Sequence, residues 1–373
     1  MVLISSTPFD TLNVYLSSTC NFACRYCYIK RLPVQKRRFS AACLIRFVRS
    51  FLAAPGSEKN IVFSGPEPLQ NFRNFKKICM SARQDASPGS RARISLVTNG
   101  SYLTDEMAAF IKDFNVDVTV SIDGSQSDHD RNRIFSDESS QSSYESCIAG
   151  VERLRKHAVT LKANLVFTAR THTRLLNNIT HLYELGFHSI NFMPALFEIW
   201  DNEGFAQLEQ ELRDFADFYI SIFKEKKPVF LNDALSNFIS GRAENRALVC
   251  RSVTVDYNGI AYCCDKVFAL PLSERKRFAI GDVRKGINLA ARNKMLGTLH
   301  REIETNMGIH CQFCSAAQHC YCPIGYYVYN SFFSKHIPDC SSQFCRISRL
   351  YIGMFRLIQS SLATDGTFLN AYA

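Results

Sequence analysis

The feature that most restricts the possible folds of this chain is a regular alternation of strand-like and helix-like segments before about residue 225. Apolar or β-branched runs lie at 12–17, 60–64, 93–98, 115–122, 159–168 and 189–194. Segments with helical periodicity lie at 40–53, 68–84, 104–114, 143–156, 173–185 and 205–225, and Ser40 and Thr104 open two of them. Six successive strand–helix units predict a parallel sheet with helices packed outside it.

Six such units are too few for a closed eight-stranded barrel. They fit a partial barrel, open on one side, better than a doubly wound sheet, although the pattern alone does not separate the two. Beyond about residue 230, glycine turns, cysteines and short segments replace the repeat. We therefore predict an α/β protein with a partial (βα)6 TIM-like barrel over residues 1–235 and a cysteine-rich domain over residues 236–373.

Distinctive short stretches stand where the predicted strands end. S-T-C follows the first strand, S-G-P-E-P the second, T-N-G the third, S-I-D-G the fourth and F-M-P-A the sixth. In folds of this class the functional residues lie at the carboxyl ends of the strands. Glycine and proline at these points allow the backbone to approach a ligand closely. A binding site is therefore expected along this edge of the sheet.

The chain holds 15 cysteines in an uneven distribution, with three near its start and eight after residue 262. It shows neither a secretory signal nor an apolar run long enough to span a membrane, so we predict a soluble, cytoplasmic protein. In the cytosol, clustered cysteines indicate metal binding or catalysis more often than disulfides.

The first cluster is the stretch S-T-C-N-F-A-C-R-Y-C-Y-I-K, with Cys20, Cys24 and Cys27 in a C-x3-C-x2-C spacing. Structural zinc sites take four ligands, and no nearby His or Cys completes this set. The alternatives are three loop cysteines without a metal, or a four-iron cluster whose fourth iron has no protein ligand and stays open for chemistry.

This spacing after the first strand of a βα repeat resembles the radical S-adenosylmethionine (radical SAM) superfamily. The resemblance implies a 4Fe–4S cluster on Cys20, Cys24 and Cys27, with S-adenosylmethionine (AdoMet) as the fourth ligand. In that superfamily an electron from the cluster cleaves AdoMet to a 5′-deoxyadenosyl radical, which abstracts hydrogen from a substrate. Tyr26 takes the aromatic position whose backbone faces the adenine.

Three further stretches match the superfamily in order, and they imply cofactor-binding residues. S-G-P-E-P resembles its G-G-E-P stretch, with Pro66 in place of the second glycine and therefore without that N–H donor. S-I-D-G with H-D-R-N-R resembles the segment that reaches the ribose and the carboxylate of AdoMet; an arginine there could instead form a surface ion pair. The residues implied by these stretches and by T-N-G are Ser64, Gly65, Glu67, Asn99, Ser121, Asp123 and Arg133.

The C-terminal cysteines resemble the SPASM domain of peptide- and protein-modifying radical enzymes, which holds two auxiliary 4Fe–4S clusters. The metal ligands implied here are Cys250, Cys264, Cys311, Cys314, Cys320, Cys322 and Cys345. The pattern expects a cysteine at position 324, where the chain has Ile324, so one auxiliary cluster is rearranged, incompletely ligated or missing. Zinc is the alternative, because C-x2-C pairs also suit tetrahedral coordination.

Cys322 rather than Cys263 is the predicted replacement ligand. Cys263 and Cys264 are adjacent, and adjacent side chains of a strand point in opposite directions, so both would reach one cluster only across a bend. Cys43, Cys79 and Cys147 fall on helix-like segments and are predicted to be buried core cysteines.

Asp265 directly follows Cys264 and resembles the aspartate that acts as general base in anaerobic sulfatase-maturating enzymes. A base needs reach to its substrate and a suitable pKa, so a solvated or ion-paired aspartate is the alternative. Asp265 is the predicted catalytic residue.

The formal charge of +10 is compatible with nucleic-acid binding, but three thiolate-ligated clusters would bring it to roughly +5. The basic run at 30–38 lacks interleaved aromatic residues and is either a solvated face or a contact for an acidic peptide. No nucleic-acid or membrane partner is expected.

The resemblance implies an enzyme that modifies a peptide or protein side chain by hydrogen abstraction, followed by oxidation or cross-linking. An anaerobic sulfatase maturase that forms formylglycine from Cys or Ser is the alternative within the class. A non-catalytic iron–sulfur scaffold or partner-binding protein is the alternative from another class. The implied partners are a peptide or protein substrate and an electron donor such as flavodoxin or ferredoxin.

Overall fold

The computed structural model describes residues 9–31, 40–54, 58–84, 91–137, 140–195, 198–240, 251–306, 328 and 343–372. The chain divides into two compact units whose segments alternate along the sequence. The first unit comprises residues 1–121, 133–160 and 249–301; the second comprises 122–132, 161–248 and 302–373. The predicted domain boundary at residue 235 stays a prediction.

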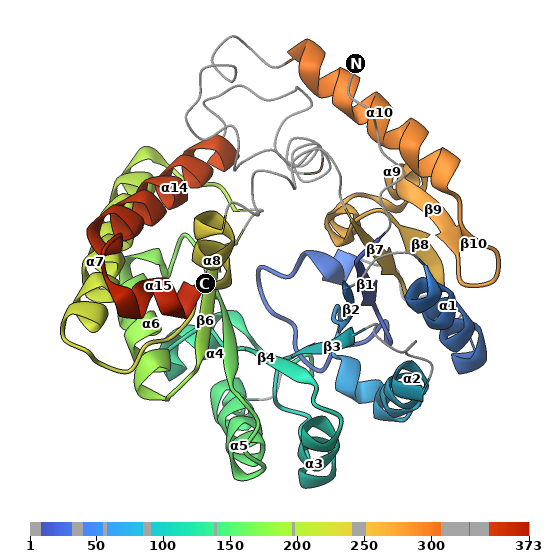
Figure 1. Ribbon diagram of the computed structural model, residues 1–373, viewed down its shortest axis with the longest axis horizontal. Helices are drawn as coiled ribbons and strands as arrows, with labels where there is room; N and C mark the ends of the chain where they lie inside the picture. The colour runs from blue at the N-terminus through green and yellow to red at the C-terminus, as the bar shows by residue number, and fades with distance from the viewer. Residues whose placement is uncertain are drawn as a thin grey trace. The chain divides into compact units, whose positions relative to one another are not determined.

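The first unit holds a sheet with strand order β10-β9-β8-β7-β1-β2-β3-β4 (Figure 1). Its strands are β1 (Thr11–Val14), β2 (Glu58–Phe63), β3 (Arg91–Thr98), β4 (Asp117–Ser121), β7 (Ser252–Val255), β8 (Ile260–Tyr262), β9 (Ala279–Asp282) and β10 (Gly286–Ile287). The run β7-β1-β2-β3-β4 is parallel, and β8, β9 and β10 continue it in antiparallel pairs. A segment beyond residue 250 thus supplies the parallel neighbour of the first strand.

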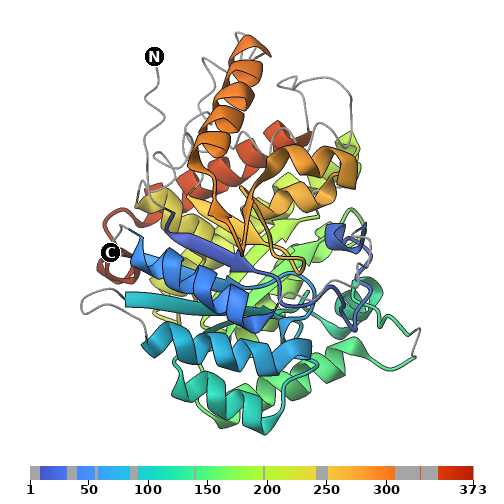
Figure 2. The ribbon, with the colours of Figure 1, turned by 90° about the vertical axis from the view of Figure 1, so that its right-hand side faces the viewer.

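The helices of the first unit connect these strands. They are η1 (Tyr28–Arg31), α1 (Ala41–Ala53), η2 (Pro68–Asn71), α2 (Phe72–Gln84), α3 (Asp105–Asp113), α5 (Ser143–Lys156), η4 (Asp265–Ala269), α9 (Leu272–Arg275), η5 (Lys276–Phe278) and α10 (Leu289–Asn306). Ser40, Thr104 and Ser142 are N-caps whose hydroxyls accept backbone N–H groups, which confirms the two predicted helix starts. In Figure 2, α1, α2 and α3 follow one another along the outside of the strands.

The second unit holds the parallel pair β5 (Lys162–Phe167) and β6 (Ser189–Pro194). Its helices are α4 (Gln126–Asn132), η3 (His172–Arg174), α6 (Leu175–Glu184), α7 (Asn202–Lys224), α8 (Asp233–Ile239), α14 (Gln343–Leu362) and α15 (Gly366–Tyr372). Helix α14 packs against α7, and the Tyr351 hydroxyl on α14 donates to the Phe192 carbonyl of β6 at 3.2 Å. Helix α14 therefore packs on α7 and reaches β6 through Tyr351.

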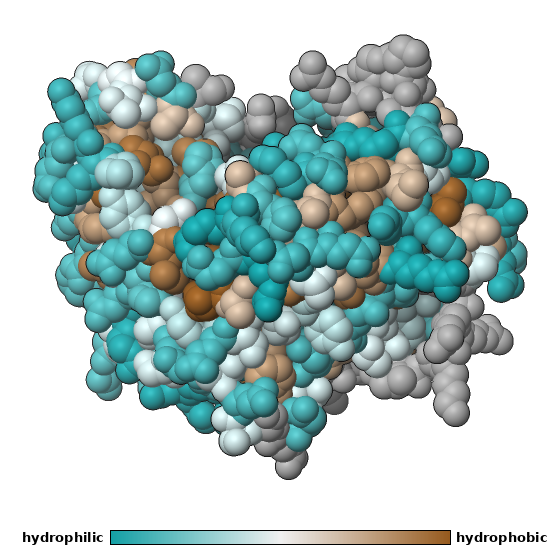
Figure 3. All heavy atoms as spheres, turned by 90° about the horizontal axis from the view of Figure 1, so that it is seen from below, coloured by the Kyte–Doolittle hydropathy of each residue, from teal (hydrophilic) through white to brown (hydrophobic). Residues whose placement is uncertain are grey.

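The predicted strand–helix units are observed as β1 to β6 with their helices, because each strand buries apolar side chains that the pattern had marked. Hydrophilic side chains dominate the face drawn in Figure 3, with small apolar areas between them. Among the described helices, none combines the length and the apolar character that a membrane span requires.

Candidate active site

The three predicted cluster cysteines lie on one loop, which begins after β1 and ends at η1. Their side chains are half-buried. The Cys27 N–H donates to the Cys24 carbonyl at 3.1 Å, and the Phe22 N–H donates to the Cys20 sulfur at 3.4 Å. Burial raises the pKa of the Cys20 thiol.

This donor set fits a 4Fe–4S cluster. Within the described ranges, no group of three or more His, Cys, Asp or Glu side chains converges on a single metal ion. The ligands of a four-iron cluster need not converge on one point. Each thiolate binds a different iron, so the three sulfurs stand apart. Hydrogen bonds from backbone N–H groups to sulfur, as at Cys20, are among the interactions that tune such clusters.

The S-G-P-E-P stretch turns sharply at the end of β2. Gly65 has φ +96°, and a Cβ atom at this position would lie 2.6 Å from the Tyr15 ring, so only glycine fits. The Glu67 side chain is buried, and its carboxylate accepts from Leu69 N at 3.1 Å, Thr98 Oγ1 at 2.7 Å and Asn99 N at 2.8 Å. Burial raises the pKa of Glu67. The carboxylate therefore ties the start of η2 to the end of β3.

Asn99 connects this region to the cysteine loop. Its Nδ2 donates to Asn21 Oδ1 at 2.9 Å and contacts the Cys20 sulfur at 3.8 Å. Its Oδ1 accepts from the backbone N–H and the hydroxyl of Ser101. The structure thus brings Cys20, Glu67 and Asn99 together, as expected for stretches that follow three neighbouring strands.

Arg133 lies against the same loop. Its side chain is buried, so the alternative of a surface ion pair is wrong. The guanidinium carbon lies 5.4 Å from the centre of the Tyr26 ring, which is cation–π distance. Ser121 ends β4 and is half-buried.

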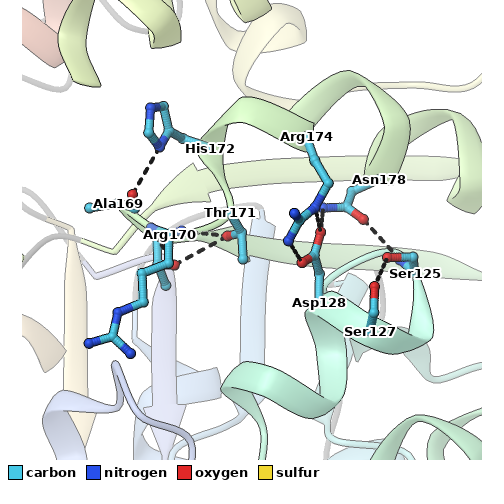
Figure 4. Close-up of polar contacts among 10 residues, drawn as sticks. Ser125, Ser127, Asp128, Ala169, Arg170, Thr171, His172, Arg174 and Asn178 are labelled. Atoms are coloured by element: carbon cyan, nitrogen blue, oxygen red, sulfur yellow. Dashed lines mark hydrogen bonds and ion pairs between the residues drawn. The ribbon is translucent and has the colours of Figure 1, made fainter. Parts of the chain in front are cut away.

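The S-I-D-G turn continues into the second unit, where Figure 4 shows its polar anchors. Asp123 is buried, and its Oδ1 accepts from Val166 N at 3.0 Å. Gly124 has φ +98°, and a Cβ there would lie 2.3 Å from Asn178. Asn178 also accepts from Ser125 N at 3.0 Å. The cofactor role of Asp123 stays a prediction. One of the carboxylate oxygens of Asp123 already accepts a hydrogen bond from β5.

Asp128, at the start of α4, holds the same turn through its buried carboxylate (Figure 4). It accepts from Arg174 Nε at 2.8 Å, from the second Arg174 nitrogen Nη2, and from Asn178 Nδ2 at 2.8 Å. Burial opposes ionisation of Asp128, but the hydrogen bonds from Arg174 and Asn178 outweigh it and lower the pKa.

Asp265 begins η4 and lies beside the cysteine loop. The Tyr28 hydroxyl, one residue after Cys27, donates to Asp265 Oδ2 at 3.3 Å. The Cys264 thiol donates to Asp265 Oδ1 at 3.5 Å. Burial raises the pKa of Tyr28 and of Tyr15, and the Asp265 charge adds to both shifts. One hydrogen bond therefore joins the predicted base to the residue after Cys27, and a second joins that base to Cys264, a predicted auxiliary-cluster ligand.

Cys263 and Cys264 point to different surroundings, as expected for neighbours at the end of a strand. The buried Cys263 thiol contacts the Met295 sulfur of α10 at 3.7 Å, whereas Cys264 contacts Asp265. This arrangement favours Cys264 over Cys263 as a ligand, and the assignment stays a prediction. Cys345 is half-buried on α14. The predicted ligands Cys250, Cys311, Cys314, Cys320 and Cys322 lie outside the described residues.

Of the three helix cysteines predicted to be buried in the core, two are buried and one is not. Cys79 and Cys147 are fully buried in the core, as expected. Cys43 is only half-buried, so its prediction was wrong. It lies in the first turn of α1, where the Ser40 hydroxyl at 3.3 Å and Arg46 at 3.4 Å donate to its sulfur. The Ser40 hydrogen bond is the largest cause of its lowered pKa.

Sequence reasoning missed the residues that link the motifs to one another, namely Tyr15, Asn21, Tyr28 and Phe135. Asn21 stands next to Cys20 and Tyr28 next to Cys27, and that adjacency was the available signal for these two. Tyr15 and Phe135 make contacts between segments that are distant in sequence, and no local pattern marks them.

Comparison with known proteins finds a matching family model for part of the chain and a similar fold. Residues 14–169 match the model of the Radical SAM superfamily. The serine-type anaerobic sulfatase-maturating enzyme of Klebsiella aerogenes is 26% identical over 202 residues, which cover 52% of this chain and 48% of that enzyme. The cysteine-type enzyme of Clostridium perfringens (strain ATCC 13124) is 23% identical over 279 residues, which cover 69% and 74% of the two chains. The chain thus spans about half the length of the first of these relatives.

Two solved structures resemble the whole chain. The structure of native anSMEcpe with bound AdoMet gives a TM-score of 0.73 at 19% identity, over 95% of this chain and 99% of that one. Streptococcus suis SuiB bound to its precursor peptide SuiA gives 0.66 at 12% identity, over 91% and 76%. These similarities confirm the predicted α/β fold with a parallel sheet in a partial barrel.

Proposed function

We propose that this chain, whose residues 14–169 belong to the radical SAM superfamily, is an enzyme that modifies a peptide or protein side chain by hydrogen abstraction. The observation that carries the proposal is the hydrogen bond between Tyr28 and Asp265. It joins a carboxylate from the C-terminal part of the chain to the loop of the three cysteines. A site of this kind offers a proton acceptor beside a redox cofactor.

Each part of the site has a task in this proposal. Cys20, Cys24 and Cys27 hold the cluster, and the region of Glu67 and Asn99 receives the amino-acid end of AdoMet. Held there, the cluster and AdoMet would supply a 5′-deoxyadenosyl radical for hydrogen abstraction, and auxiliary clusters would supply an electron acceptor. Asp265 takes a proton from the substrate, as a general base within reach of it would.

Formylglycine formation is the second candidate, and the sulfatase-maturating relatives favour it. Oxidation of a Ser side chain to an aldehyde removes one hydrogen atom from Cβ, one proton from the hydroxyl and one electron. A Cys side chain loses the same three particles, and hydrolysis of the thioaldehyde then releases sulfide. Asp265 would accept the proton in either case. The same residues would serve a cross-linking reaction on a precursor peptide, the class of ligand bound in the SuiB structure.

AdoMet cleavage tests the enzyme class. The protein, reconstituted anaerobically with iron and sulfide and reduced by dithionite, should convert AdoMet to 5′-deoxyadenosine, and Cys24→Ala should not. Cys43→Ala is the matched control, because this half-buried cysteine lies on α1 outside the loop, and it should retain activity. Equal cleavage by Cys24→Ala and wild type, or none by wild type, would reject the proposal.

The substrate class needs a separate assay. Synthetic peptides with a central Cys or Ser, and any short peptide found to be encoded beside this gene, would be incubated with the active enzyme and analysed by mass spectrometry. A mass loss that matches an aldehyde supports the maturase candidate, whereas loss of hydrogen with a new linkage supports cross-linking. A cytoplasmic location and flavodoxin or ferredoxin as the electron donor belong to the same proposal.

A further inference from the structure

Residues 133–136 run alongside the cysteine loop and contact it through both backbone and side chains. Ala23 N donates to the Ile134 carbonyl at 2.6 Å, and Ser136 N donates to the Asn21 carbonyl at 2.8 Å. Between these two bonds, Phe22 and Phe135 form an antiparallel bridge. The backbone between Cys20 and Cys24 is therefore paired with residues 134–136 as in a very short sheet.

Side chains extend this pairing to the rest of the loop. The rings of Phe22 and Phe135 meet edge to face, with centres 4.9 Å apart at 89°, and Phe22 is buried. This is a favourable arrangement for two aromatic rings. The Arg133 guanidinium lies over the ring of Tyr26, which is between Cys24 and Cys27. Four consecutive residues thus contact both intervals of the C-x3-C-x2-C loop.

We propose that residues 133–136 are a positioning element for the cluster, with the Phe135 ring as its main side-chain contact. The inference rests on the proposed cluster at Cys20, Cys24 and Cys27. A loop that carries three thiolates has many conformations, and only those with correctly spaced sulfurs bind four irons. The backbone pairing and the two aromatic contacts keep the loop in one conformation. Partners of this indirect kind typically change metal retention or activity by about 10–100-fold.

The chain offers matched controls. Ile134 and Ser136 contribute backbone atoms to the pairing, and their side chains are exposed. Ile134→Ala and Ser136→Ala should therefore leave the loop unchanged. Phe135→Ala removes the ring, Phe135→Tyr keeps it, and Ser136→Pro removes the N–H that donates to Asn21.

The first measurement uses the apoprotein and needs no cluster. Alkylation of Cys20, Cys24 and Cys27 by iodoacetamide would be followed by peptide mass spectrometry, with Cys43 as the internal standard. Phe135→Ala and Ser136→Pro should speed alkylation of the loop thiols relative to Cys43 by up to about tenfold, the usual worth of one aromatic pair or one hydrogen bond. Phe135→Tyr and the two alanine controls should match wild type. Equal rates in Phe135→Ala and wild type would overturn the proposal.

The second measurement uses the reconstituted protein. The rate at which a chelator removes iron should rise by about 10–100-fold in Phe135→Ala and return toward wild type in Phe135→Tyr. The change that AdoMet causes in the electron paramagnetic resonance signal of the reduced cluster should weaken in Phe135→Ala and in Ser136→Pro, but not in Phe135→Tyr or the two alanine controls. Unchanged iron loss and an unchanged signal would also overturn the proposal. If wild type binds no cluster, the proposed function fails, while the alkylation result still decides the role of the 133–136 segment in the loop.

Discussion

Two tyrosines, Tyr28 and Tyr15, connect the region of the cysteine loop to the short helix of the predicted base, Asp265. Tyr28 donates to Asp265, and Tyr15 packs its ring 4.9 Å from Phe268, which lies in the same short helix as Asp265. Burial keeps both phenols neutral by raising their pKa values. A neutral Tyr28 can donate to the carboxylate, which orients Asp265 toward the loop.

Asp265→Asn should leave AdoMet cleavage nearly intact and slow product formation by about 10²–10⁴-fold, because an amide cannot take the proton. Both rates would be measured in one reaction, as 5′-deoxyadenosine and as modified peptide. Glu274→Gln, an exposed carboxylate of α9, is the control and should change neither rate. Unchanged product formation in Asp265→Asn would assign this aspartate a structural role.

Gly65→Ala should destabilise the protein through two separate effects. A non-glycine residue at φ +96° costs about 1–3 kcal/mol, and the new methyl would overlap the Tyr15 ring. Gly286→Ala is the matched control, because Gly286 has φ +84° with open space around it. The free energies of unfolding of the two variants, measured in denaturant, should therefore differ. Equal losses would mean that Tyr15 moves aside without cost.

At the level of elements, the start of α4 is attached to η3 and α6 by one carboxylate. Asp128 accepts from both Arg174 and Asn178, and Asn178 in turn holds Ser125 in the S-I-D-G turn (Figure 4). The turn that carries Asp123 thus has its shape set by helices that come later in the chain. A substitution of Asp128 should therefore alter the conformation of the S-I-D-G turn and also lower the stability of the protein.

Asp128→Asn should lower the free energy of unfolding at neutral pH by about 1.5–3 kcal/mol, the usual worth of a hydrogen bond to a charged group. In wild type the folded state lowers the pKa of Asp128. Its stabilisation is therefore complete above the unfolded value of about 3.9 and is lost as pH falls through the lower folded value. Unfolding measured as a function of pH should show this loss in wild type and not in Asp128→Asn. Asp113→Asn, an exposed residue of α3, should keep the wild-type profile.

At the scale of the whole molecule, we expect the cluster of the cysteine loop and the predicted C-terminal clusters to assemble independently of each other. Cys20→Ala, Cys24→Ala and Cys27→Ala should each abolish AdoMet cleavage while the protein folds and keeps its C-terminal iron. Two remaining thiolates cannot hold a four-iron cluster with an open iron. Iron counting and Mössbauer spectra would measure both sites. Loss of all iron in a single loop variant would show that the sites do not assemble independently.

The same spectra test the predicted auxiliary ligands. Cys322→Ala should lose a cluster and Cys263→Ala should not, because the Cys263 thiol is buried against Met295. A cluster lost only in Cys263→Ala would reverse the assignment. If neither variant lost iron, the second auxiliary cluster, predicted on Cys250, Cys264 and Cys322, would be missing from this protein.

The sequence by itself determined the strand–helix units, the helix caps at Ser40 and Thr104, and the cysteine spacing. These features are local: side-chain periodicity and capping act over a few residues and can be read without the fold. Cys43 shows the limit of such reasoning, because apolar periodicity does not say how deeply one cysteine of a first helical turn is buried.

Only the tertiary structure decided what meets at the site. Asp265 accepts a hydrogen bond from Tyr28, 237 positions away in sequence. The Phe135 ring contacts the Phe22 ring, and β7 pairs in parallel with β1. Contacts between distant segments leave no periodic signal, because each depends on how the rest of the chain closes between them. A single hydrogen bond or ring pair is also worth too little to appear in composition. The residues that connect the parts of the site could therefore be identified only from the folded structure.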